Sequence, residues 1–154
     1  MAPSARIRRA EDGFSLVELM IVLLVIAVLM VIGIVSYSQM TRSANDKAAQ
    51  LDLLTAVKVQ TLHHLDNDVF TDDKAALLDL EPMLRYTDDG IPAGTVVVKF
   101  EPGREATDVC LFTQTEQGDW FSMYHSVDTG DLYAESSPID CTPGDVAAWS
   151  NESW

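Results

Sequence analysis

The first half of the chain has very few residues that interrupt a helix. No proline occurs between Phe14 and Glu81, and Gly33 is the only glycine in that stretch. Proline removes a backbone donor and clashes with the preceding turn, and glycine raises the entropic cost of ordering the backbone. Their scarcity predicts one long helix that continues without a break through residues 38–65.

Charged side chains are missing between Leu19 and Thr41, and the residues up to Val35 are almost all apolar. A helix rises about 1.5 Å per residue, so an apolar run of this length crosses a hydrocarbon core of roughly 30 Å. The sequence therefore predicts one membrane-spanning segment, residues 14–37. An acid, Glu18, lies one turn inside it, where an unpaired carboxylate costs on the order of 2.5 kcal/mol or more near the bilayer centre. We expect Glu18 to have a partner.

A signal-peptidase site is also missing, because no small-residue cleavage pattern follows the apolar run as it does in a secretory signal peptide. Three arginines, Arg6, Arg8 and Arg9, precede the run instead, and a small residue, Gly13, stands directly before Phe14. Basic residues on this side place the N-terminus in the cytoplasm. We expect a single-pass protein of the cytoplasmic membrane, with the rest of the chain exported.

Basic residues are scarce in the distal part of the chain. After Leu65 there are nineteen acidic residues and four basic ones, and the whole chain has a net charge of −14. A surface this negative repels phosphate backbones, so we expect no general nucleic-acid binding. At 154 residues the chain has room for one anchor and one small domain.

Catalytic and metal-binding motifs are absent from the sequence, and we therefore expect no enzyme activity and no cofactor. His63 and His64 point about 100° apart on a helix, so they are interpreted as solvated surface residues. Asp128-Thr129-Gly130-Asp131 could bind calcium, but a hairpin turn is the favoured interpretation.

One eight-residue stretch carries a specific signal: Gly13-Phe14-Ser15-Leu16-Val17-Glu18-Leu19-Met20. It resembles the cleavage and methylation motif of type IV pilins and of their relatives, the pseudopilins of type II secretion. The resemblance implies that a prepilin peptidase cuts after Gly13, that Phe14 is then N-methylated, and that Glu18 is needed for filament assembly. Residues 1–13 would be the leader, and removing their three arginines and two acids changes the net charge from −14 to −15.

Physical chemistry supports the implied role of Glu18. Cleavage after Gly13 creates a cationic amine at Phe14, and Glu18 of a neighbouring subunit could neutralise it inside an apolar filament core. Two charges that are each too costly to bury alone become tolerable as a pair. The alternative is a plain signal anchor in which the carboxylate of Glu18 reaches the membrane interface.

Only two cysteines occur, Cys110 and Cys141, and both lie in the part expected in an oxidising compartment. A disulfide closing this loop of roughly 30 residues would stabilise the fold by about 3 to 4 kcal/mol on the chain-entropy model. Type IV pilins commonly carry a disulfide around a C-terminal loop region, and this pair is similar. Two buried thiols remain the alternative.

The resemblance also implies an α+β fold in which a long N-terminal helix packs on a small antiparallel sheet. Residues 38–66 form an amphipathic second half of the helix with two apolar stripes, one of Ala48, Leu51, Leu54, Val59, Leu62 and Leu65, the other of Ala49, Leu53, Ala56 and Val57. The first stripe is expected to carry the sheet through Val96, Val98, Phe100, Leu111, Phe121 and Met123. The second stripe would face neighbouring subunits or simply extend the core.

The remaining chain divides into two parts. Residues 67–94 form a connector with a short helix, Ala75–Met83, capped by Asp73 or Thr71. Residues 95–154 form the sheet and a disulfide-bounded C-terminal region. Four strands separated by turn signals are expected to form an antiparallel meander: Thr95–Phe100, Thr107–Gln114, Asp119–Val127 and Asp131–Glu135.

Taken together, these features predict a structural subunit of a type IV pilus that is held by lipid before it joins a helical filament of identical copies on the cell surface. Its expected partners are the prepilin peptidase and the assembly platform proteins of the membrane. A pseudopilin of type II secretion or a minor pilin is the alternative from the same family. A signal-anchored, exported binding domain is the alternative from another class.

Overall fold

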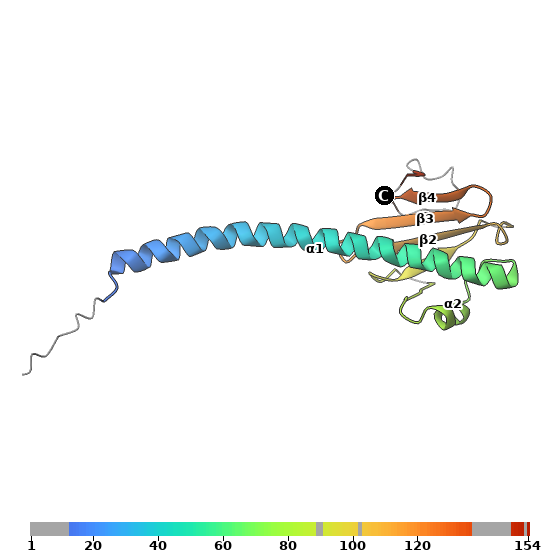
Figure 1. Cartoon of the computed structure of the whole chain (residues 1–154), viewed down its shortest axis with the longest axis horizontal. Coiled ribbons are helices and arrows are strands. Elements are labelled where there is room, and N and C mark those ends of the chain that lie inside the picture. Colours follow the sequence, from blue (N-terminus) through green and yellow to red (C-terminus); the bar gives the residue numbers. More distant parts are fainter. Residues whose placement is uncertain (1–12, 89–90, 102, 137–148, 153) are drawn as a thin grey trace, which may run out of the picture. The chain divides into compact units, whose positions relative to one another are not determined.

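The computed structural model describes residues 13–88, 91–101, 103–136, 149–152 and 154. Its elements, drawn in Figure 1, are α1 (Leu16–Asn67), α2 (Lys74–Leu80), β1 (Val96–Lys99), β2 (Asp108–Gln114), β3 (Trp120–Ser126) and β4 (Gly130–Ala134). The expected α+β class is confirmed. The chain divides into two compact units, residues 1–40 and residues 41–154, and α1 contributes to both.

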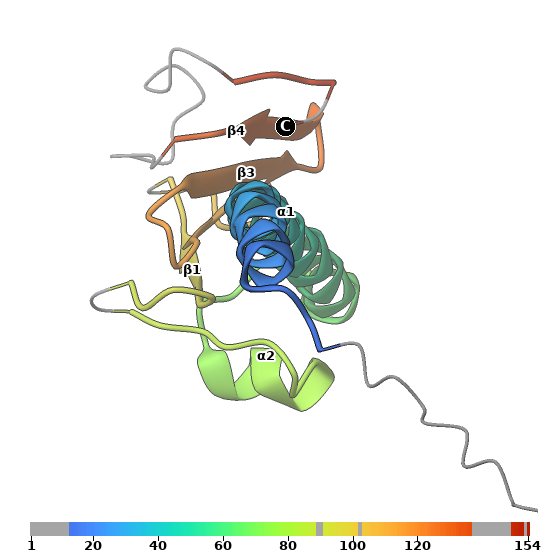
Figure 2. The same cartoon turned by 90° about the vertical axis from the view of Figure 1, so that its left-hand side faces the viewer.

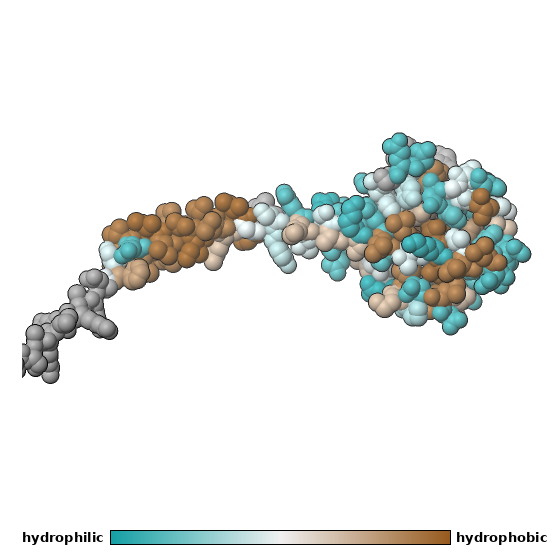
Figure 3. Space-filling model, in the orientation of Figure 1, coloured by the Kyte–Doolittle hydropathy of each residue, from teal (hydrophilic) through white to brown (hydrophobic). Residues whose placement is uncertain are grey.

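The first unit consists of the N-terminal part of α1. Among the described helices, α1 is the one that is long and apolar enough to cross a membrane, and none of its apolar window is buried. The space-filling view shows this part as an almost continuous apolar surface (Figure 3). Exposed apolar side chains on every face of a helix are typical of a segment that is solvated by lipid or by other helices.

The other end of α1 lies in the second unit and has a defined stop. Asp68 follows the helix with a φ of 57°, and its N–H donates to the carbonyl of His64 at 2.8 Å. A left-handed residue directly after the last turn is a common helix C-cap, and Asp tolerates this conformation better than most residues. The predicted helix end near residues 66–68 is confirmed.

The four strands form one antiparallel sheet in the order β1-β2-β3-β4, as the turn signals predicted. Val98 lies opposite Leu111, Leu111 opposite Met123, and Met123 opposite Tyr133, so these side chains share one face. Gly118, in the β2–β3 turn, and Gly130, where β4 begins, have φ values of 91° and 83°, a conformation that favours glycine. Figure 2 shows α2 on the β1 side of the sheet, away from β4.

The short helix α2 begins as predicted but ends earlier. Asp73 is its N-cap, and its carboxylate accepts the N–H of Ala75 at 2.9 Å. The helix stops at Leu80 and does not continue to Met83. Glu81 takes a φ of −142°, because a residue before proline, here Pro82, is pushed away from the helical region.

The apolar stripe of α1 that packs on the sheet is not the one that the sequence favoured. Ala49, Leu53, Ala56 and Val57 are buried with the predicted sheet residues Val96, Leu111, Phe121 and Met123. Leu51, Leu62 and Leu65 remain 61%, 53% and 72% exposed. The prediction was therefore wrong for these three leucines, although Val59 of the same stripe is buried in the core and Leu54 packs against it. The face of the sheet that packs on α1 was predicted correctly.

The size of the side chains explains which stripe is buried. Ala49 and Ala56 have short side chains, so the helix backbone can approach the sheet closely while Leu53, which is fully buried, fills the space between them. Periodicity shows that two stripes exist, but it does not rank them. The exposed leucines are left on the opposite side of this part of α1.

Candidate assembly surface

The residues of the predicted processing motif lie directly before α1. Gly13 and Phe14 precede the first helical residue, Leu16, and the Phe14 side chain is 80% exposed. Nothing in the described chain lies within 4 Å of the position that a Cβ on Gly13 would occupy. The bond between Gly13 and Phe14 is therefore in exposed, non-helical backbone, the kind of segment that a peptidase can bind in an extended form.

Glu18 is the acidic residue of the first turn of α1, and it is exposed. An acid at this end of a helix interacts favourably with the helix dipole. No Lys or Arg occurs between Phe14 and Thr41. Within the first unit, the one cation that can reach Glu18 from the mature chain is thus the amine that cleavage would create at Phe14.

The apolar surface that follows Glu18 belongs to one continuous helical segment. Its large side chains from Leu19 to Ile34 are exposed by between 42% and 71%. Side chains of this kind cannot remain in water over such an area, so a bilayer or other apolar helices must cover them. Three features therefore lie together: an accessible Gly13–Phe14 bond, an acid one turn later, and a long apolar surface.

The comparisons with known proteins agree with this geometry. Residues 8–34 match the family model described as the prokaryotic N-terminal methylation motif. The chain is also 38% identical, over 72 residues, to the type IV wide pilus major component PilA4 of Thermus thermophilus. The N-terminal segment thus carries this methylation motif, and the chain is similar to a type IV pilin.

The similarity to the Thermus pilin covers only part of each protein. The aligned region is 47% of this chain and 55% of the relative, so the chain spans about half the length of the pilin that it matches.

The structure describes only one of the two predicted disulfide partners. Cys110 lies in β2, opposite Tyr124 of β3, and is buried. Cys141 lies outside the described residues. The Cys110–Cys141 bond therefore stays a prediction.

An ion pair between a buried carboxylate and a half-exposed guanidinium lies near Cys110, and the sequence reasoning missed it. The carboxylate of Asp108 is fully buried at the start of β2 and pairs with the guanidinium of Arg104 four residues earlier. Burial and a hydrogen bond to Asp108 raise the pKa of the Tyr124 hydroxyl above its ordinary value. The sequence does contain a signal for this pair, because Asp108 is an acid inside a strand otherwise rich in apolar residues. A buried acid requires a partner.

The histidines of the second unit are bonded to the fold, and the expectation that His63 and His64 are solvated surface residues was wrong. His63 Nδ1 lies 3.0 Å from the carbonyl oxygen of Val69, and His64 Nε2 lies 2.8 Å from that of Ala106. Both rings are partly buried. Their carbonyl partners belong to the loops that follow α1 and precede β2, which sequence spacing could not reveal.

The candidate calcium loop forms the turn between β3 and β4. His125 Nδ1 lies 2.5 Å from the carboxylate of Asp131, and the N–H of Asp128 donates to the Ser126 hydroxyl at 3.3 Å. Across the described ranges, no three Asp, Glu, His or Cys side chains are grouped so that they could hold a metal ion.

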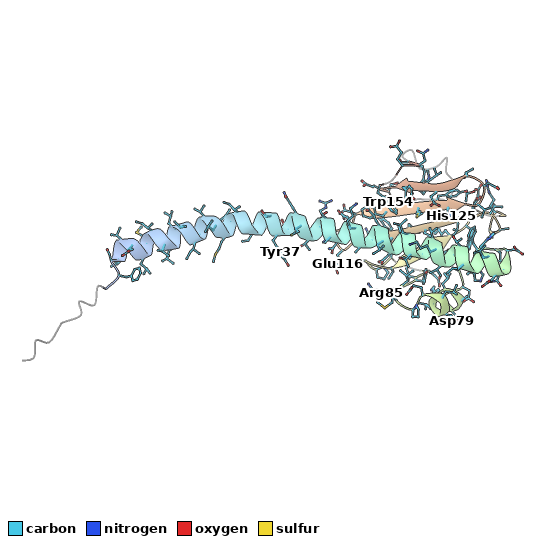
Figure 4. The ribbon with its side chains drawn as sticks, viewed as in Figure 1. Tyr37, Asp79, Arg85, Glu116, His125 and Trp154 are labelled. Carbon is cyan, nitrogen blue, oxygen red and sulfur yellow. The ribbon has the colours of Figure 1, made fainter. Side chains whose placement is uncertain are left out.

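A shallow cavity of about 220 Å³ lies between α1 and the end of β2, and it is lined in part by Asp52, Arg85, Gln114 and Glu116. Arg85 and Glu116 of this lining are labelled in Figure 4. Burial raises the pKa of Asp52, and the charge of Arg85 opposes that shift. The lining contains no Ser, Cys or His that could act as a nucleophile or general base.

Proposed function

We propose that this protein is a structural subunit of a type IV pilus. The observation that carries the proposal is the arrangement of the N-terminal motif, in which an exposed Gly13–Phe14 bond precedes an apolar helix with Glu18 in its first turn. The match to the methylation motif and the similarity to a major pilus component support it.

In this proposal the protein is first an anchored precursor. Residues 14–37 cross the cytoplasmic membrane with the leader, residues 1–13, inside the cell. A prepilin peptidase cuts after Gly13, and Phe14 is N-methylated. Lipid covers the apolar side chains of α1 until assembly.

Extraction into the filament replaces lipid around α1 with the same segment of other copies, so close packing and polar pairing supply the energy of association. The pair between Glu18 and the Phe14 amine of a neighbour then removes two unpaired charges from an apolar core. The platform proteins of the membrane would supply the force that drives extraction.

Shearing of the producing cells tests this proposal. We expect electron microscopy of the sheared fraction to show filaments that contain this protein. A Glu18→Ala variant should remain in the membrane in normal amount but be reduced about tenfold or more in the sheared fraction, because loss of one partner of a buried pair costs several kcal/mol. Normal filament formation by Glu18→Ala, or sheared filaments that lack the protein, would overturn the proposal.

A further inference from the structure

The exposed face of α1 in the second unit carries two charges that have no partner within the described chain. Four charged residues of α1 beyond Met40 are exposed: Arg42, Lys47, Lys58 and Asp66. Arg42 lies 2.7 Å from the carboxylate of Asp119, and Lys47 donates to the side chain of Gln50 at 2.9 Å. Lys58 and Asp66 have no comparable contact among the described residues.

Both charges lie beside exposed leucines. Leu62 stands four residues after Lys58 and four before Asp66, so it is a surface neighbour of each, and Leu65 directly precedes Asp66. Leu62 is 53% and Leu65 72% exposed. This surface combines apolar side chains with one positive and one negative group, a composition suited to contact with another protein chain.

Lys58 and Asp66 cannot form a pair within one helix. Eight residues correspond to a rise of about 12 Å and a rotation of about 80° along an α-helix. Side chains that meet on a helix surface are three or four residues apart. The charge of Asp66 also lies in the last turn of α1, where a negative group interacts unfavourably with the helix dipole.

We propose that the Lys58 ammonium of one copy pairs with the Asp66 carboxylate of an adjacent copy and thereby sets the axial displacement of neighbouring helices. This inference rests on the proposed function, in which all copies enter the filament from one membrane and their α1 helices are parallel. A displacement of about 12 Å brings Lys58 of one helix level with Asp66 of the next. The Lys58 side chain can bridge helices that are separated by about 8 to 10 Å.

The positions of the two residues around α1 suit a repeating contact. A filament is built from a head-to-tail interface, in which each copy uses one surface toward one neighbour and a different surface toward the other. Lys58 and Asp66 are about 80° apart around the helix and thus can face two different neighbours. Asp66 is the one exposed acid of α1 between Thr41 and Asn67.

Zero-length cross-linking of sheared wild-type filaments tests the contact directly. A carbodiimide joins an amine to a carboxylate only where the two are in contact. We expect a dimer on a denaturing gel that contains the Lys58–Asp66 cross-link by peptide mass spectrometry, and no such cross-link in filaments of a Lys58→Gln variant. Wild-type filaments without the cross-link would overturn the inference but leave the proposed function standing.

Charge reversal gives a second readout. Lys58→Glu and Asp66→Lys should each lower sheared protein about tenfold or more, and the double variant should restore it to within about threefold of wild type, since the pair is then reversed. Lys99→Glu, the same charge change at an exposed position on β1, is the matched control and should leave yield unchanged. Single reversals that assemble like Lys99→Glu, or a double variant no better than the singles at equal membrane abundance, would overturn the inference. Absence of wild-type filaments would overturn the proposed function and this inference together.

Discussion

Gln60 and Thr71 are joined by two hydrogen bonds between one side chain and one backbone unit. Gln60 Nε2 donates to the Thr71 carbonyl at 2.6 Å, and the Thr71 N–H donates to Gln60 Oε1 at 3.0 Å. Gln60 is fully buried on the face of α1 that packs on the sheet. Its amide therefore fixes the connector after α1 to the helix and satisfies two backbone groups of the partly buried Thr71.

Replacement of Gln60 by Ala should destabilise the second unit by about 2 to 4 kcal/mol, because two buried backbone groups lose their partners and a cavity forms. Urea unfolding of the full chain in mild detergent, followed by tryptophan fluorescence, measures this change, since the three tryptophans lie in this unit. Gln50→Ala is the matched control, because the Gln50 side chain accepts a hydrogen bond from Lys47 on the exposed surface. It should cost less than about 1 kcal/mol. Equal effects of the two substitutions would contradict this role of Gln60.

The buried ion pair gives a second stability prediction. Asp108→Asn should destabilise the sheet by about 1 to 3 kcal/mol, because the fully buried side chain loses its charged hydrogen bond to the half-exposed Arg104. Glu101→Gln is the control, since Glu101 lies 3.8 Å from the same guanidinium in a more exposed pair and should contribute less than about 1 kcal/mol. The same unfolding measurement applies. Asp108→Asn with a cost as small as that of Glu101→Gln would show that the buried pair adds nothing.

Stability should fall at alkaline pH because of Tyr86. Burial, assisted by the charge of Glu81, raises the pKa of the Tyr86 hydroxyl from 10.0 to about 12. The folded state therefore holds this proton more tightly than the unfolded state does, so the contribution of Tyr86 is fully present below pH 10 and is lost as the pH rises toward about 12. Unfolding free energies measured across this range should fall less steeply for Tyr86→Phe than for wild type. Identical slopes would contradict the raised pKa.

The mass of the alkylated protein tests the predicted Cys110–Cys141 disulfide. Alkylation of protein denatured without reductant should add no mass, and alkylation after reduction should add two alkyl groups. Reduction should also lower stability by about 3 to 4 kcal/mol, the value expected for a loop of this length. Two alkyl groups added without reductant would show that both thiols are unpaired.

The sequence was sufficient wherever local signals decide the structure. The turn residues around Gly118 and Gly130 predicted the positions of two hairpins correctly. The scarcity of proline and glycine before Glu81 predicted the continuous helix α1. Sequence reasoning failed where partners lie far apart along the chain. The choice between the stripe of Leu53 and the stripe of Leu62 depends on how closely a helix can approach a sheet, which periodicity does not encode.

Polar residues that act through distant contacts were missed for the same reason. Gln60 is one such residue, because its partner Thr71 lies eleven residues later in the connector. Lys58 and Asp66 were not singled out either, because their importance became visible only when the neighbouring leucines proved to be exposed. The motif residues Gly13, Phe14 and Glu18, by contrast, lie within a few positions of one another, so the sequence alone shows the motif to which they belong.

The mass of the intact subunit recovered from sheared filaments tests the central claim most directly. We expect a chain that begins at Phe14 and carries one methyl group on its amine, with residues 1–13 absent. A filament subunit that retains the leader, or one that begins at any residue other than Phe14, would contradict the account of cleavage at Gly13 and pairing with Glu18.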